Sequence, residues 1–241
     1  MKFFKYVLLN GLLFTFLISC STSCSHDMEE ENSDLSSSQV NRIRSYDKVL
    51  ILGNSIAKHA PKAEIDWYGD WGMAASAEEY DFVHVLQSHF SKYNSDIEFK
   101  VETISGFETA YWLFDTTSYT SLKAWKPDLI IVRLGDNVDD SLVNELPISG
   151  YMEYLIEYLK GGSDAKVCMT NSFWPKPNYN QQVLAVCIQN EYDHVSIADL
   201  YYSDGSLATA TYGNTVVGLH PSDNGMKVIA NRIWSKLTET K

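Results

Sequence analysis

The fold of this chain follows from the segment Lys48-Val-Leu-Ile-Leu-Gly-Asn-Ser55. Its apolar run ends abruptly in Gly53-Asn54-Ser55, which is typical of a buried strand followed by a tight turn. A strand that is apolar on both faces indicates a parallel sheet with helices on each side. Such sheets bind ligands at the carboxyl ends of their strands, so Ser55 is a candidate nucleophile. Gly, Asn and Ser are also common turn formers, and on this segment alone a plain turn is the better explanation.

The composition is that of a globular protein with one sizeable domain. Of the 241 residues, 45% are hydrophobic and 21% are charged. The formal net charge is −12 at pH 7, and the sequence contains no basic stripe. Because a phosphate backbone is held by clustered Lys and Arg, nucleic acid is not expected as a partner.

Residues 1–19 are predicted to be a lipoprotein signal peptide. Two lysines precede an apolar stretch over 7–18, which is short for a membrane span. It ends in Leu17-Ile18-Ser19-Cys20, which resembles the lipobox of bacterial lipoproteins. That resemblance implies cleavage before Cys20 and a lipid anchor on its thiol. The alternative is an ordinary secretory signal. In both cases the protein leaves the cytoplasm, and we expect it in the cell envelope, periplasmic or at the cell surface.

The segment 20–45 is rich in Ser, Asp, Glu and Asn. Such a composition buries too little apolar surface to order itself. We therefore expect a disordered tether over 20–45 and a folded domain over 46–241.

Strand and helix patterns alternate through that domain. Ser76 and Glu79 have the spacing of a capping box, which predicts a helix from Ser76 to about Lys92. Five strands alternating with helices indicate an α/β domain with a doubly wound parallel sheet. After the first strand, the expected strands cover 96–104, 127–134, 165–173 and 194–200, and the other main helices cover 151–159, 180–190 and 222–237.

Three of the expected strands end in small or polar residues, namely Ser55, Gly106 and Asn137. The loop that carries His220 follows the fifth strand and returns to the same edge of the sheet. These residues suffice for acyl transfer, in which Ser55 attacks and His220 takes its proton. The N–H groups of Ser55 and Gly106 and the Asn137 amide would hold the developing oxyanion. The histidines show no metal-binding spacing, so neither a metal nor an organic cofactor is expected.

Four short blocks in this domain resemble, in order, those of the SGNH (GDSL-like) hydrolases. The resemblance runs from about Lys48 to the C-terminus. It implies a flavodoxin-like, three-layer α/β/α fold, with Ser55 as nucleophile, His220 as base, and Gly106 and Asn137 as oxyanion donors. Members of the family include esterases, lipases, carbohydrate O-deacetylases and acyltransferases. The blocks are Gly53-Asn54-Ser55, Gly106, Gly135-Asp136-Asn137 and Gly218-Leu219-His220-Pro221.

Two positions depart from the family pattern. Asn54 replaces an Asp that is not the nucleophile, so this change is tolerable. More seriously, Val217 stands where the family usually has an Asp, three residues before the His. In serine proteases, replacing the triad Asp by Asn lowers kcat by about 10⁴. We hypothesise a Ser55–His220 dyad in which a backbone carbonyl near Val217, or a remote carboxylate such as Asp199, orients His220. A weakened or inactive enzyme is the alternative.

Several other side chains have both a functional and a structural explanation. Trp67, Trp71 and Trp174 are expected in loops near the active edge, where they would form a platform for sugar rings or simply pack. His59 is close to Ser55 in sequence and would line the site or support the fold.

Asp136 is expected to be a helix N-cap just before Val138. Cys168 and Cys187 are expected as buried free thiols; the alternative is a disulfide, which an oxidising compartment permits.

The sequence thus predicts a serine esterase of the cell envelope. It would remove acetyl or other small acyl groups from an acylated small molecule or glycan. The reaction would run through an acyl-Ser55 intermediate and a water activated by His220. One alternative is an acyltransferase on the same fold, and another is a glycan-binding lipoprotein with little or no turnover.

Overall fold

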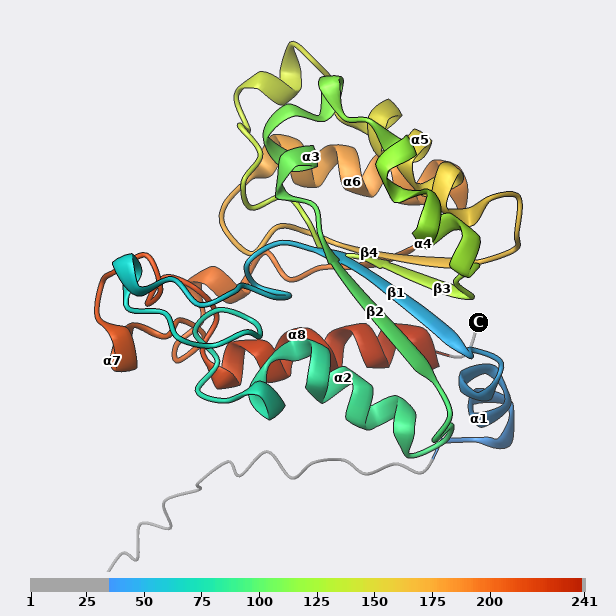
Figure 1. Ribbon diagram of the computed structural model, residues 1–241, viewed down its shortest axis with the longest axis horizontal. Helices are drawn as coiled ribbons and strands as arrows, with labels where there is room; N and C mark the ends of the chain where they lie inside the picture. The colour runs from blue at the N-terminus through green and yellow to red at the C-terminus, as the bar shows by residue number, and fades with distance from the viewer. Residues whose placement is uncertain (1–34, 240–241) are drawn as a thin grey trace, which may run out of the picture. The chain divides into compact units, whose positions relative to one another are not determined.

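The computed structural model describes residues 35–239, whose arrangement is shown in Figure 1. The predicted signal peptide, Cys20 and the first part of the predicted tether lie outside the described residues. Within the described part, no helix is both long and apolar enough to cross a membrane.

Five parallel strands form one sheet in the order β2-β1-β3-β4-β5, which confirms the predicted doubly wound architecture. In the middle of the sheet, Ile51 lies beside Val101 on one side and Ile131 on the other. The strand order reverses between β1 and β3, which is where flavodoxin-like sheets bind their ligands. The strands are β1 (Lys48–Gly53), β2 (Glu98–Thr103), β3 (Leu129–Val132), β4 (Lys166–Thr170) and β5 (Asp193–Val195).

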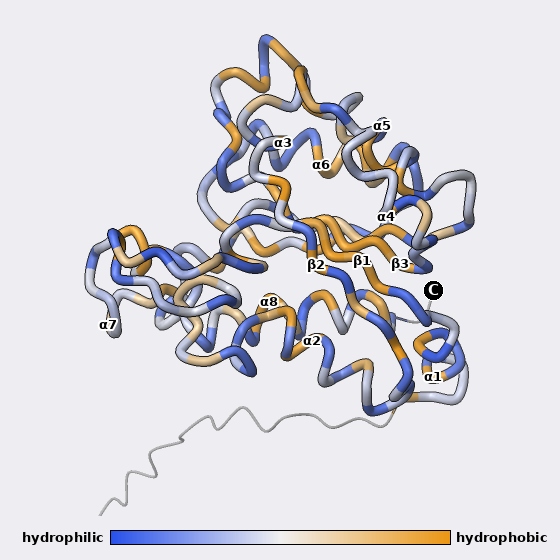
Figure 2. The backbone as a smooth tube through the Cα atoms, viewed as in Figure 1, coloured by the Kyte–Doolittle hydropathy of each residue, from blue (hydrophilic) through white to orange (hydrophobic). Residues whose placement is uncertain are grey.

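Helices cover both faces of the sheet, so the fold has three layers (Figure 1). Val49 and Ile51 face the layer that contains α2 and α8, whereas Leu50 and Leu52 face the layer that contains α5 and α6. This alternation explains the unbroken apolar run of β1, and Figure 2 shows the same hydrophobic colour along β1 and β3. The helices are α1 (Ser37–Arg44), α2 (Phe82–Ser91), α3 (Ser105–Ala110), α4 (Thr120–Trp125), α5 (Ser149–Lys160), α6 (Pro177–Asn190), α7 (Thr209–Tyr212) and α8 (Asp223–Thr238). Short 3-10 turns occupy Ala63–Ile65, Glu78–Tyr80, Tyr111–Leu113, Thr116–Tyr119, Leu142–Asn144 and Leu200–Tyr202.

Helix α1 corrects the predicted boundary of the tether. Ser36 and Gln39 form a capping box at its start. Ile43 is fully buried in the core, and Gln39 donates to the Thr238 carbonyl of α8 at 2.6 Å. The compact unit therefore begins at Leu35, inside the segment whose polar composition predicted disorder.

The N-terminus of α2 differs from the prediction as well. The helix begins at Phe82, and its cap is Asp81, whose side chain accepts from the His84 N–H at 2.8 Å. The Ser76 hydroxyl is engaged elsewhere, donating to Asp223 at 2.6 Å. The capping-box prediction at Ser76 is therefore wrong.

Cys168 and Cys187 are both buried free thiols, as expected. Cys168 belongs to the core on the α2 and α8 side of the sheet, and Cys187 belongs to the core on the α6 side. The sheet between these two layers explains why the thiols do not pair.

Candidate active site

Ser55 lies at the sharp turn that follows β1. The Asn54 side chain fixes this turn, because its Oδ1 accepts from the Ile56 N–H at 3.1 Å. The Asn54 carbonyl accepts from the Ala57 N–H at 2.9 Å, and the Ser55 carbonyl accepts from the Met73 N–H at 2.8 Å. The turn is thereby held on both sides of Ser55, and the serine remains partly exposed at the edge of the sheet.

The structure brings Ser55 and His220 together, as the sequence predicted. Their Oγ and Nε2 atoms are 2.9 Å apart. On the other side of the ring, Nδ1 is 2.8 Å from the Val216 carbonyl oxygen. A carbonyl only accepts, so Nδ1 carries the proton and Nε2 presents its lone pair to the Ser55 hydroxyl. This is the tautomer that a general base needs.

Two groups were considered for orienting His220, a backbone carbonyl near Val217 and the carboxylate of Asp199. The structure has the carbonyl of Val216 in this position. Asp199 forms an ion pair with Arg232, with Oδ2 and Nη2 2.7 Å apart. The remote carboxylate is therefore not the partner of His220. The side chain of Val217 is buried in a small apolar cluster, while the carbonyl of the preceding residue accepts from the histidine.

The loop that carries His220 is held at several points. The Ala208 N–H donates to the His220 carbonyl at 3.0 Å. Trp174 packs edge-on against the imidazole, with centroids 4.9 Å apart, and its Nε1–H donates to the Leu219 carbonyl. Gly218 has no room for a side chain, because a Cβ there would lie 1.8 Å from the Gly213 carbonyl oxygen. These contacts fix the position of the Val216 carbonyl relative to the imidazole.

His220 is 3% exposed. Burial lowers its pKa to about 4, and the Arg133 guanidinium acts in the same direction, while the bond to the Val216 carbonyl and the Asp136 carboxylate oppose it. The imidazole is therefore neutral at neutral pH and able to accept a proton.

The three predicted oxyanion donors surround the same strand ends. Gly106 is at the start of α3, after β2, and Asn137 follows β3. Among residues 35–239, neither the Ser55 N–H nor the Gly106 N–H has a hydrogen-bond acceptor. The Asn137 Nδ2 donates to Glu108 Oε2 at 2.6 Å, which uses one of its two hydrogens.

A buried polar network beneath Ser55 was not predicted from the sequence. Arg133 is fully buried and pairs with Asp136 and with Asn54 Oδ1, the latter at 3.1 Å. Asp136 also accepts from the N–H groups of Phe173 and Trp174, at 2.8 and 3.1 Å. It is therefore the hub between β3 and the loop after β4 and not the helix cap that we predicted. The signal in the sequence is an Arg directly after the apolar run of β3, because an arginine is almost never fully buried unless it is paired.

Glu108 is the second carboxylate of this network. It is 1% exposed and accepts from Asn54 Nδ2 at 2.9 Å and from the Gly135 N–H at 2.6 Å. Burial and the nearby Asp136 raise the pKa of Glu108, and the hydrogen bonds from Asn137, Asn54 and Gly135 oppose the rise. Although burial also acts to raise the pKa of Asp136, the Arg133 and Asn54 side chains hold it below its ordinary value.

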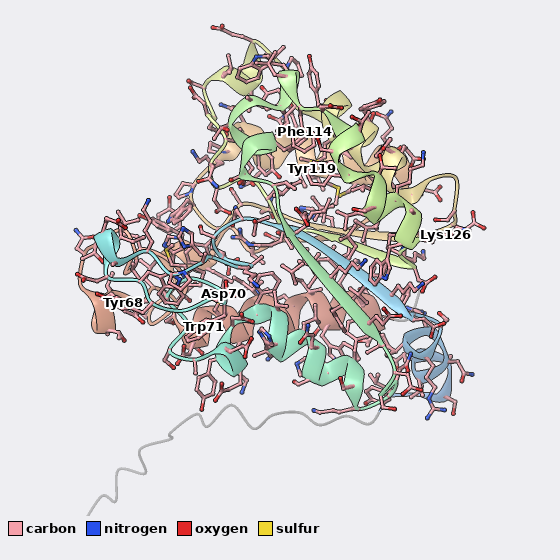
Figure 3. The ribbon with its side chains drawn as sticks, in the orientation of Figure 1. Tyr68, Asp70, Trp71, Phe114, Tyr119 and Lys126 are labelled. Atoms are coloured by element: carbon pink, nitrogen blue, oxygen red, sulfur yellow. The ribbon has the colours of Figure 1, made fainter. Side chains whose placement is uncertain are left out.

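The three loop tryptophans, for which both a sugar platform and plain packing were open, lie in different surroundings. Trp174 contacts His220, as described above. Trp67 is 2% exposed and donates to the His59 carbonyl, so it is a packing residue. Trp71 is partly buried, packs edge-on against Trp67 and donates to the Ala75 carbonyl. Figure 3 shows Trp71 on the loop after β1, at the end of the sheet away from α1, and Tyr68 beside it is 70% exposed.

His59 and the possibility of a metal site were the remaining questions from the sequence. His59 acts to lower the pKa of His220, and its N–H donates to the Trp71 carbonyl at 2.9 Å; its role at the site stays a prediction. Within residues 35–239, no group of three His, Cys, Asp or Glu side chains could hold a metal ion.

The structure is similar to solved structures of esterases and lipolytic proteins. The psychrotrophic esterase EstA from Pseudoalteromonas sp. superposes with a TM-score of 0.51 and 16% identity, over 79% of this chain and 96% of that one. A two-domain esterase (CEX) active on acetylated mannans gives 0.55 and 14%, over 82% and 52%. A putative lipolytic protein of the G-D-S-L family from Desulfitobacterium hafniense DCB-2 gives 0.50 and 15%, over 80% and 99%.

The sequence matches no protein-family model, and no curated protein matches it. The similarity to the solved structures is therefore one of fold. The chain has the three-layer α/β/α fold of GDSL-like esterases, which the four sequence blocks implied.

Proposed function

We propose that this protein is a serine esterase of the SGNH type. The observation that carries the proposal is the hydrogen-bonded series from Ser55 Oγ to His220 Nε2 and from His220 Nδ1 to the Val216 carbonyl, at 2.9 and 2.8 Å. It supplies a nucleophile, a base and the group that orients the base. The similarity of the fold to that of known esterases also supports the proposal.

The reaction follows from these positions. Ser55 Oγ attacks the ester carbonyl carbon while its proton moves to His220 Nε2. The carbonyl oxygen becomes an oxyanion. It accepts hydrogen bonds from the N–H groups of Ser55 and Gly106 and from the second Nδ2 hydrogen of Asn137. The ester bond then breaks, and the departing alcohol takes the proton from His220. A water that His220 deprotonates then attacks the carbonyl carbon of the acyl-Ser55 ester. The bond to Ser55 Oγ breaks, Oγ takes the proton back from His220, and the carboxylic acid leaves.

Hydrolysis of p-nitrophenyl acetate by the full chain tests the proposal, beside Ser55→Ala and His220→Ala. Each substitution should lower kcat by about 10⁴ or more, because nucleophile and base act as a unit. Thermal unfolding of all three proteins checks that the variants are folded. Equal, trace turnover in all three would contradict the proposal and favour a glycan-binding protein without turnover.

The substrate class that we propose is an O-acetylated carbohydrate. One structural neighbour is active on acetylated mannans. Release of acetate from acetylated mannan by the wild type, and its loss in Ser55→Ala, is the expected result. Transfer of the acetyl group to an added sugar, with no free acetate, would instead indicate an acyltransferase.

The location that we propose is the cell envelope, with a lipid anchor on Cys20. The support is the lipobox-like segment at 17–20. Metabolic labelling with a radioactive fatty acid should mark the wild type and leave Cys20→Ser unmarked. Labelling of both proteins would contradict the anchor site.

A further inference from the structure

We propose that Glu108 is a positioning residue that aligns the Asn137 amide for the oxyanion; this inference rests on the proposed esterase function. Glu108 lies on α3, two residues after Gly106, and is almost completely buried. Its Oε2 accepts from Asn137 Nδ2 at 2.6 Å, and its Oε1 is 3.4 Å from the Asn137 N–H. One carboxylate therefore fixes both the side chain and the backbone of the same residue.

The remaining partners of Glu108 belong to the same apparatus. Its Oε1 accepts from the Gly135 N–H at 2.6 Å and from Asn54 Nδ2 at 2.9 Å. Asn54 directly precedes the nucleophile Ser55, and Gly135 begins the turn that carries Asn137. Glu108 thus connects the helix after β2 with the turns after β1 and β3, which together carry all three oxyanion donors.

The geometry of the amide explains why such a connection matters. An Asn side chain rotates about two bonds, and an oxyanion donor must be in place before the charge develops. Since one Nδ2 hydrogen of Asn137 is bound to Glu108, the plane of the amide is fixed and the second hydrogen has one direction. Without Glu108, the amide would have to be ordered during the reaction.

A purely structural role would not call for a carboxylate here. Burying a carboxylate has an unfavourable desolvation free energy, and well-packed apolar residues often replace buried charges without loss of stability. Each partner of Glu108 is an N–H donor, and the ionised carboxylate, which only accepts, satisfies all of these donors without presenting an O–H to any of them. The negative charge itself would repel the oxyanion, and the proposed benefit is therefore geometric.

The test is a double-mutant cycle between Glu108→Gln and Asn137→Ala, read as kcat and KM for p-nitrophenyl acetate on the full chain. Asn137→Ala should lower kcat by roughly 10²–10³, the usual effect of losing one oxyanion donor. Glu108→Gln keeps the shape but turns an NH₂ group toward an N–H donor, and it should lower kcat by at least about tenfold with KM little changed. In the Asn137→Ala background, Glu108→Gln should have almost no further effect.

The matched control is Glu98→Gln, an exposed glutamate at the far end of β2, which should behave as the wild type. If the fold reductions in kcat of the two single variants multiply in the double variant, the inference is overturned, because Glu108 would then act independently of Asn137. A kcat of Glu108→Gln equal to or above that of the wild type would also overturn it, since repulsion would outweigh positioning.

A second readout separates this inference from the proposed function. A wild type no faster than Ser55→Ala would refute the esterase proposal, whereas an active wild type with an equally fast Glu108→Gln would refute only the role of Glu108. If Glu108→Gln does not fold, Glu108→Asp replaces it in the cycle, with the same outcomes. Independently of turnover, the short bond should shift an Asn137 side-chain proton downfield in the NMR spectrum, and an unchanged shift in the Glu108 variant would overturn the proposal.

Discussion

At the scale of single residues, the ionisation of His220 decides the pH dependence of turnover. The base must be neutral, and burial lowers the pKa of His220 to about 4. As far as His220 alone decides it, turnover should therefore persist well below the ordinary histidine pKa of about 6.5 and fall as pH approaches 4.

Protonation of Glu108 would also lower turnover at acid pH, because it takes an acceptor away from Asn137. The pKa of Glu108 is raised, so this protonation belongs to the same acid limb of the profile. The profile of kcat/KM should therefore be measured for the wild type and for Glu108→Gln, which lacks that titration. The absorbance is read at the wavelength where nitrophenol and nitrophenolate absorb equally. An acid midpoint at or above pH 6.5 in Glu108→Gln would contradict the lowered pKa of His220.

Val217 offers a second test at this scale, because it occupies the position where the related hydrolases usually carry an Asp. Its side chain is 1% exposed, in a cluster with Trp67 and Met73. Val217→Asp should lower the free energy of unfolding by about 2–4 kcal/mol, since it buries a carboxylate without a partner. It should not raise kcat, because the His220 Nδ1 already has its acceptor.

Urea denaturation and ester hydrolysis measure the two effects of Val217→Asp. The control is Val216→Asp, whose side chain is 61% exposed and whose carbonyl is retained. A Val217→Asp variant that is as stable as the wild type and faster would show that the histidine gains from a carboxylate after all.

At the scale of elements, α1 belongs to the folded domain because it covers the end of α8. Arg42 donates to the carbonyl of Glu239 at 2.6 Å, and Gln39 donates to the carbonyl of Thr238. The side chain of Ile43 is fully buried. These bonds satisfy carbonyl groups that the last turn of a helix leaves without partners.

Ile43→Ala should therefore lower the free energy of unfolding by about 2–5 kcal/mol, the usual effect of deleting a buried branched side chain. Ile188→Ala is the control, because Ile188 is 71% exposed on α6. Urea denaturation of both variants gives the comparison. Equal stabilities would mean that α1 contributes little to the fold, as a tether would.

At the scale of the whole molecule, the sequence predicted what depends on local pattern. The apolar run of β1, its closing turn and the polar strand ends identified the sheet, its direction and the meeting of Ser55 with His220. These features need only the period of the strands and the rule that parallel strands end at one edge.

What the sequence did not predict depends on pairing between distant segments. Arg133 is buried because Asp136 and Asn54 neutralise and bind it, and no local pattern reveals those partners. Composition marked α1 as disordered, because a single buried Ile43 is averaged out among polar neighbours. For Trp67 the sequence left a sugar platform and plain packing open, and the structure encloses the ring among Met73, Ala208 and Val217, which belong to separate loops.

The backbone acceptor of His220 has an evolutionary consequence. In a triad, one base change can turn the acid into a residue that no longer orients the histidine. Here the acceptor is the peptide carbonyl of Val216, which every amino acid at that position would supply. The vulnerable sites are instead those that shape the path of the loop, such as Gly218, where any added side chain meets the Gly213 carbonyl. Selection on this dyad should therefore act on the course of the chain rather than on the chemistry of a third side chain.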